Sequence, residues 1–339
     1  MNTKIIKLFL YSSPVGKIEL LKLFIGIILL YPINISLRFI SYVGLVFSYK
    51  FFLNINALLF NLMVILNPVV KGKLYDITKN LRQIFSLNEK EDNLTKLAYK
   101  SLENRYYDSL VFSDIFLFLI RKNRFLNISL SMRLHNDTDL KFPYCGKRKI
   151  IFCHMHTSNK ISSIIKIESM VCKKLKTLYL QRSHSKKLRK FIQSINVLLG
   201  KKNVSTYDPF HQSSTGMEFF RKVKQSDIVH TYVDFNEYLA LKKFSTTKIN
   251  FLGKSTFVVD GVARFAIATK SICIPVFVND DDVHLLPMID TLQLNSHDKV
   301  HELMQSIYSE LSIVLVNYPE KWNYLDEAET FFRNIKFKE

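Results

Sequence analysis

The chain changes from one spacing of apolar residues to another along its length. From Asp76 to about Asn123, apolar residues recur near positions i, i+3, i+4 and i+7, which predicts amphipathic helices. After Phe142-Pro143, short apolar runs rich in β-branched and aromatic residues predict strands. The strand-sized runs are "KIIFC", "LKTLYL", "DIVHTYVD" and "ICIPVFV", separated by the helical stretches "NKISSIIKIESMVCKK", "SKKLRKFIQSINVLLG", "STGMEFFRKVKQ" and "DGVARFAIATK". This alternation predicts an α/β fold, with a mixed or parallel central sheet flanked by helices on both faces.

The N-terminal region is predominantly apolar. Twenty uncharged residues lie between Lys50 and Lys71, enough to cross a hydrocarbon core of about 30 Å, although four asparagines weaken this reading. We expect residues 17–70 to form membrane-associated helices; buried core helices are the alternative. The chain is therefore predicted to have three regions: membrane-associated helices at 1–75, a helical lead-in at 76–142 and an α/β domain at 143–339.

Charge narrows the classes of partner. The formal net charge is +19, which suits nucleic acid, an anionic membrane surface or an acidic substrate. No nucleic-acid-binding module is recognisable and the basic residues are scattered, so we expect no nucleic-acid partner. The four cysteines show neither CxxC spacing nor a framework pattern, which predicts reduced thiols in a cytoplasm-facing protein. We expect neither a metal nor a cofactor.

Two histidines stand at a predicted strand-to-helix junction, in "IIFCHMHTSNKISS". A histidine there can serve as a general base, but no carboxylate lies in this stretch to orient it. Asn159, five residues after His154, could accept a hydrogen bond from a ring N–H and fix the tautomer without adding charge. His156 is the alternative base, and a chain with no catalytic histidine is the third possibility. Glu168 lies about three turns into the predicted helix, too far to substitute without a bend.

Three further stretches carry a family resemblance. They are "ITKNLRQIFSLNEKEDNLTKLAYKSLENRYYDSL", "INFLGKSTFVVDGVARFAIATKSICIPVFV" and "YPEKWNY". With the histidine junction, they make the chain resemble the bacterial late lipid A acyltransferases of the lauroyl and myristoyl type, a branch of the lysophospholipid acyltransferase superfamily. The resemblance runs from about residue 20 to residue 330, and it implies a glycerol-3-phosphate acyltransferase-like α/β domain. The family has an acidic residue where this chain has Asn159.

The resemblance also implies residues that bind substrate. Arg182 would bind a phosphate or carboxyl group bidentately, or else belong to a solvated basic face. Asp234 ends a predicted strand, where ligands of open α/β sheets gather, or else caps a loop. Gly253 and Gly261 would allow tight backbone geometry. Lys254 and Arg264 would help to bind an anionic headgroup or a phosphopantetheine arm.

The expected function follows from the resemblance. It is a membrane-associated acyltransferase that moves a fatty acyl group from an acyl-carrier-protein or CoA thioester to a hydroxyl of a glycolipid or lipid-like acceptor. The expected location is the cytoplasmic face of the inner membrane. One alternative is a family member that binds an acyl chain or carrier without turnover, and another is acylation of a specialised metabolite rather than lipid A.

Overall fold

The structure is a computed structural model, and it describes residues 57–58, 60–65, 67–85, 91–111, 122–157, 159–180, 186–209, 216–234 and 244–333. The chain divides into two compact units, residues 1–72 and residues 73–339. Most of the predicted membrane-associated region lies outside the described residues. Within the described ranges, every helix is too short or too polar to cross a bilayer.

In the first unit, the described residues are mainly helical. Residues 57–65 form a helix wherever they are described, and the backbone N–H of Val69 donates to Asn67 Oδ1 at 2.9 Å. Asparagine is a favourable residue for such a cap, because its side-chain oxygen satisfies an N–H that the first helical turn leaves open. A new helix therefore begins at Pro68 and continues into the second unit.

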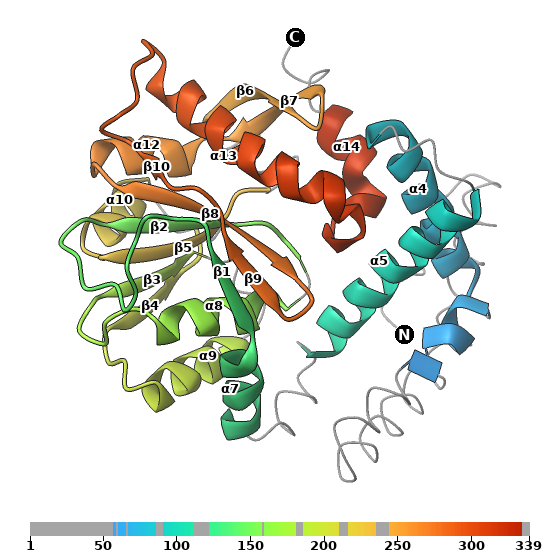
Figure 1. The fold of residues 1–339 in the computed structure, drawn as a ribbon, viewed down its shortest axis with the longest axis horizontal. Helices are drawn as coiled ribbons and strands as arrows, with labels where there is room; N and C mark the ends of the chain where they lie inside the picture. The colour runs from blue at the N-terminus through green and yellow to red at the C-terminus, as the bar shows by residue number, and fades with distance from the viewer. Residues whose placement is uncertain are drawn as a thin grey trace, which may run out of the picture. The chain divides into compact units, whose positions relative to one another are not determined.

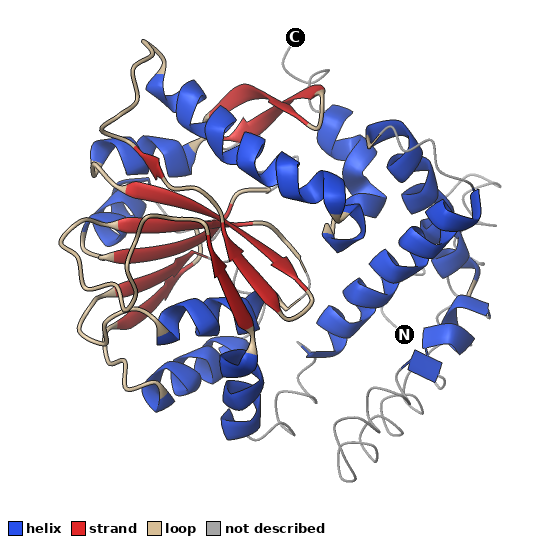
Figure 2. Cartoon of the chain, in the orientation of Figure 1, coloured by secondary structure: helices blue, strands red, loops and turns tan. Residues whose placement is uncertain are grey.

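The second unit is built on a mixed sheet (Figures 1 and 2). The strands of this sheet are β1 (Arg133–Asn136), β2 (Ile150–His154), β3 (Thr177–Leu180), β4 (Val204–Tyr207), β5 (Ile228–Tyr232), β8 (Ile272–Asn279), β9 (Asp282–Leu285) and β10 (Ile289–Asp290). Their order is β1-β9-β8-β2-β5-β3-β4, with β10 beside β8. From β8 to β4 every neighbouring pair is parallel, whereas β9 and β10 run antiparallel to β8.

Helices lie on either side of this sheet. Figure 1 shows α7, α8 and α9 on one face and α12 and α13 on the other. A separate antiparallel hairpin packs against α13. The helices are α4 (Pro68–Ile84), α5 (Glu91–Val111), α7 (Lys122–Ser131), α8 (Lys160–Ser169), α9 (Lys186–Leu198), α10 (Gly216–Lys224), α12 (Gly261–Ala268), α13 (Lys299–Asn317) and α14 (Ala328–Arg333), with 3-10 turns η1 (Pro319–Lys321) and η2 (Leu325–Glu327); the hairpin strands are β6 (Thr246–Phe251) and β7 (Lys254–Val259).

The central strands are buried because helices cover both of their faces. Every residue of β2 and β3 is buried, and so is all of β8 except its last residue. Parallel strands covered on both faces have continuous apolar sequences, which is why "KIIFC" and "ICIPVFV" identified them. The predicted mixed α/β sheet flanked by helices is confirmed.

Two elements differ from the sequence prediction. Residues 133–136, inside the predicted helical lead-in, form the edge strand β1, which pairs with β9. Its sequence "RLHN" is short and mostly exposed, so it has no apolar pattern that would predict a strand. Helix α8 ends at Ser169 rather than near Lys174, because the chain turns there into a β-bridge between Tyr144 and Val171.

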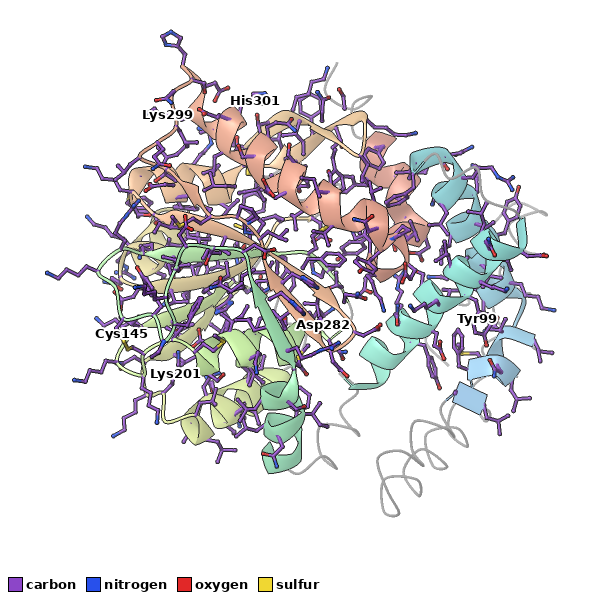
Figure 3. All side chains as sticks on the ribbon, in the orientation of Figure 1. Tyr99, Cys145, Lys201, Asp282, Lys299 and His301 are labelled. Atoms are coloured by element: carbon purple, nitrogen blue, oxygen red, sulfur yellow. A yellow bond between two sulfur atoms is a disulfide. The ribbon has the colours of Figure 1, made fainter. Side chains whose placement is uncertain are left out.

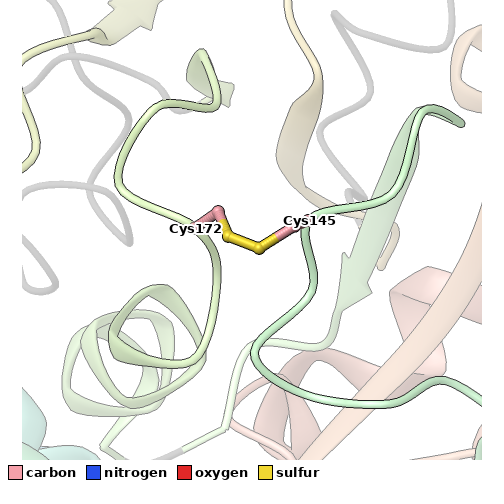
Figure 4. The surroundings of a disulfide bond; sticks show 2 residues. All are labelled: Cys145 and Cys172. Carbon is pink, nitrogen blue, oxygen red and sulfur yellow. A yellow bond between two sulfur atoms is a disulfide. The ribbon is translucent and has the colours of Figure 1, made fainter.

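That bridge also explains an unexpected disulfide (Figure 4). It holds the segments around Tyr144 and Val171 side by side, and the Cα atoms of Cys145 and Cys172 lie 5.2 Å apart with their sulfurs bonded. The prediction of reduced thiols is wrong for this pair, because contacts between distant segments bring the cysteines together and no local spacing motif encodes it. The other two cysteines are buried free thiols: Cys153 and Cys273.

The central sheet should carry much of the stability. Ile274 is fully buried in β8, and Ile274→Ala should lower the free energy of unfolding by about 2–5 kcal/mol, through lost apolar contact and the cavity left behind. Urea denaturation followed by circular dichroism measures this change. In the matched variant Ile313→Ala, the side chain removed is 63% exposed, and the change should stay within about 0.5 kcal/mol. Equal losses in the two variants would contradict the assignment of β8 to the core.

Candidate active site

Strands β2 and β5 place two sets of polar side chains opposite each other. The strands are parallel neighbours, with His154 in register with Tyr232. Alternate residues of a strand point to the same face of the sheet. The side chains of His154 and His156 therefore lie on one face along β2 and its continuation. Those of His230, Tyr232 and Asp234 lie beside them, along β5 and its continuation. Ligands of open α/β sheets bind at the carboxyl ends of strands, which is where His156 and Asp234 lie.

His156 and Asp234 form a hydrogen-bonded pair. The ring Nδ1 of His156 lies 2.7 Å from Asp234 Oδ1, and the backbone N–H of His156 donates to Asp234 Oδ2 at 2.9 Å. The Asp234 side chain is fully buried, whereas the His156 side chain is 14% exposed. The carboxylate therefore fixes both the backbone and the ring of His156.

The C-terminal segment 322–324 closes around this pair. Trp322 is fully buried, and its Nε1–H donates to Asp234 Oδ2 at 3.0 Å. The N–H of Asn323 donates to the carbonyl oxygen of His156 at 2.8 Å, and the ring of Tyr324 meets the imidazole edge-on, with centroids 4.9 Å apart. Three consecutive residues thus contact the pair, which gives the "YPEKWNY" stretch a definite structural task.

The arrangement is suited to general base catalysis. A carboxylate can only accept hydrogen bonds, so Nδ1 of the neutral His156 ring carries the proton and Nε2 carries the lone pair. The ring also stacks on Tyr232, with centroids 4.2 Å apart and planes inclined by 23°. A histidine oriented by a buried aspartate in this way can take a proton from a hydroxyl, and the aspartate then stabilises the imidazolium.

His154 belongs to a second group, which we call the buried row: Lys201, Glu168, His230 and His154. His154 Nε2 lies 2.9 Å from His230 Nδ1, and His230 Nε2 lies 2.9 Å from Glu168 Oε1. Lys201 donates to Glu168 Oε2. All four residues are 0–2% exposed. The row therefore runs inside the layer between the sheet and helix α8.

Burial sets the charge of the two rings in the row. It lowers the pKa of His154 well below its usual value, and the neighbouring His230 and His156 lower it further. Burial also lowers the pKa of His230, outweighing the opposite effect of Glu168. Burial alone would raise the pKa of Glu168, but its bonds to His230 and the charge of Lys201 bring it below the usual value. At neutral pH both rings are therefore uncharged and Glu168 is ionised.

The predicted pairing of His154 with Asn159 does not occur. Asn159 precedes α8 in the left-handed conformation, with φ 58°, and its side-chain NH₂ donates to the carbonyl oxygen of Asp280 at 3.0 Å. Adjacent strands bring His230 to the His154 ring instead. Glu168 is distant along the helix, as expected from the sequence, yet His230 connects it to His154.

The other predicted substrate-binding residues lie in three places. Asp234 is fully buried and contacts the His156 ring. Gly253, with φ 73°, forms the β6–β7 turn just before Lys254, and Gly261 begins α12. Arg264 binds Asp260 through two hydrogen bonds of 2.9 Å, so its guanidinium already has a carboxylate partner. Arg182 lies outside the described residues.

Sequence reasoning missed the residues that complete the two groups: His230, Lys201, Tyr232 and Tyr324. A usable signal was present in the strands, because "HMH" and "HTYVD" both place polar or aromatic side chains at alternate positions. Two such strands, if adjacent, must face each other on one side of the sheet. Their adjacency was the missing information.

No protein-family model matches the chain, and no match was found among curated proteins. Among the described residues, no group of three or more histidine, cysteine, aspartate or glutamate side chains is arranged to hold a metal ion.

Trp322 should stabilise the fold through its bond to Asp234. Trp322→Phe keeps an aromatic ring but removes the Nε1–H donor, and it should lower the free energy of unfolding by about 2–3 kcal/mol, as expected for a hydrogen bond to a charged group. Urea denaturation followed by circular dichroism measures the loss. Tyr318→Phe, a change to an exposed aromatic residue just after α13, should have a much smaller effect. Equal stability of the wild type and Trp322→Phe would rule out this role.

The buried rings should make stability depend on pH. In the unfolded chain each ring titrates near pH 6.5, whereas the folded pKa values of His154 and His230 are lower. Below pH 6.5 the unfolded chain therefore binds more protons, and the free energy of unfolding falls as pH falls. The fall is at most about 1.4 kcal/mol per pH unit for each ring. Urea denaturation at about pH 7 and about pH 5.5 tests this expectation, and the variant His154→Gln/His230→Gln should show a weaker dependence than the wild type.

Proposed function

We propose that the protein is an acyltransferase in which His156 is the general base and Asp234 orients it. The observation that carries the proposal is the 2.7 Å contact between His156 Nδ1 and the buried carboxylate of Asp234, at the carboxyl ends of adjacent parallel strands. The acid that the sequence lacks at Asn159 is supplied from a different strand. Sequence resemblance to the late lipid A acyltransferases supports acyl transfer as the reaction.

In the proposed reaction, the hydroxyl oxygen of the acceptor attacks the carbonyl carbon of a thioester. At the same time, Nε2 of His156 takes the proton of that hydroxyl. A carbon–oxygen bond forms, and the negative charge that develops on the carbonyl oxygen needs hydrogen-bond donors. The first turn of α8 begins four residues after His156 and can supply backbone N–H groups. When the carbon–sulfur bond breaks, the thiolate leaves and receives the proton from the His156 imidazolium.

The substrates in this proposal are an acyl-carrier-protein or CoA thioester and a glycolipid or lipid-like acceptor with a free hydroxyl. The net charge of +19 supports an acidic carrier and an anionic membrane surface as partners. The apolar N-terminal sequence supports action at the inner membrane. The Cys145–Cys172 disulfide weighs against the cytoplasmic face, because disulfides are uncommon in reducing compartments.

The proposed roles of His156 and Asp234 can be tested with the purified protein. We expect acyl transfer from radiolabelled acyl-carrier protein or acyl-CoA to a lipid A precursor or a glycosyl diacylglycerol. His156→Gln should lower kcat/KM by about 10²–10⁴-fold, because it removes the base. Asp234→Asn should cost up to about 10⁴-fold, because an amide can present its NH₂ to Nδ1 and favour the wrong tautomer. His135→Gln, which alters a half-exposed histidine on β1, should leave the rate unchanged.

The outcomes separate the candidate functions. Loss of transfer in His156→Gln and Asp234→Asn, with normal folding by circular dichroism, supports the proposal. Unchanged transfer in His156→Gln would refute His156 as the base. A wild-type protein that binds acyl-carrier protein but transfers no acyl group to either acceptor would favour the binding function.

A further inference from the structure

The buried row is an unusually polar feature for the interior of a domain. It joins one cation, one carboxylate and two imidazoles from β2, α8, β5 and the loop before β4, each 0–2% exposed. Lys201 lies three residues before β4, at the same end of the sheet as Cys145 (Figure 3), whereas His154 is the last residue of β2. The row thus runs from the amino-terminal ends of the strands towards the His156–Asp234 pair.

The directions of the hydrogen bonds in the row follow from the ionised Glu168 and from the neutral rings of His230 and His154, whose pKa values burial lowers. Ionised Glu168 only accepts, so the ring of His230 carries its proton on Nε2 and donates to Glu168. Nδ1 of His230 then has a lone pair, and Nε2–H of His154 donates to it. Burial holds the pKa of His154 well below its usual value, so the ring is neutral at neutral pH, with its proton on Nε2 and none on Nδ1. One carboxylate fixes the tautomers of two rings in series.

The buried row and the His156–Asp234 pair both connect β2 to β5. His154 and His156 are two residues apart along β2 and its continuation, and His230 and Asp234 are four residues apart along β5 and its continuation. The His154–His230 bond therefore fastens the end of β2 to β5 immediately before the His156–Asp234 bond. A neutral His154 also places no positive charge beside His156, where a second cation would oppose imidazolium formation.

We infer that the buried row positions His156 for its role as base. In this inference, which rests on the proposed function, Glu168 and His230 act through His154 and touch no substrate. Lys201 balances the charge of Glu168, so that the carboxylate stays ionised inside the domain. An apolar core at these positions would avoid the cost of burying two charges, but it could not dictate a tautomer.

The test removes both charges together, because Glu168→Gln alone would leave Lys201 buried without its carboxylate partner. In the variant Glu168→Gln/Lys201→Met, the amide can either donate or accept, so it no longer fixes the proton positions. The matched control is Tyr179→Phe, which removes the hydrogen bond from the Tyr179 hydroxyl to Asn196 but keeps the aromatic ring beside His230.

The primary readout is nitrogen NMR of the imidazoles at neutral pH, without substrate. In the wild type and in Tyr179→Phe, we expect His154 and His230 to be neutral with the proton on Nε2, and His156 to carry its proton on Nδ1. In the double variant, we expect mixed tautomers at His154 and His230 and altered His156 signals. Its kcat/KM should fall about 10–100-fold, as is typical when an outer partner of a functional histidine is removed.

Each result decides a separate point. Protonated rings or Nδ1–H tautomers at His154 and His230 in the wild type would overturn the inference, and so would unchanged His156 signals in the double variant. These signals do not depend on acyl transfer. If the tautomers match expectation but the wild type transfers no acyl group, the proposed function fails and the positioning of His156 stands.

Discussion

Asp234 is a fully buried carboxylate, and much of the site is organised by the need to satisfy it. A buried charge is tolerated only with close hydrogen-bond donors, and among the described residues Asp234 accepts from the ring and backbone N–H of His156 and from the indole of Trp322. These donors come from the end of β2 and from the segment after α13. One carboxylate at the end of β5 therefore holds two distant parts of the chain against each other.

The sequence was informative where local pattern determines structure. Continuous apolar runs located β2, β3, β5 and β8, because helices cover both faces of these strands and leave few polar positions. The helical spacing of apolar residues between Asp76 and Asn123 likewise predicted helices where α4 and α5 lie. The short exposed strand β1 has no such pattern, and only its pairing with β9 makes it a strand.

The site depended on contacts that no local pattern encodes. The junction holding His154 and His156 could be found from sequence, but their partners lie about 80 residues further on, in a strand whose position in the sheet was unknown. Choosing a partner by sequence distance pointed to Asn159, whose amide instead bonds the β8–β9 hairpin. Sequence distance also makes Glu168 look too remote from His154, because it does not reveal that His230 lies between them.

The disulfide has a consequence for the unfolded chain. Cys145 and Cys172 are 27 residues apart, and the segment between them contains all of β2, both histidines of the junction and helix α8. When the bridge is intact, this segment remains a covalent ring even without any folded structure. Closing a ring of that size restricts the unfolded ensemble by an entropy worth on the order of 3–4 kcal/mol in the chain-entropy model. The disulfide thus restricts the unfolded conformations of the histidine junction and of helix α8 together, and its reduction would remove this restriction from both.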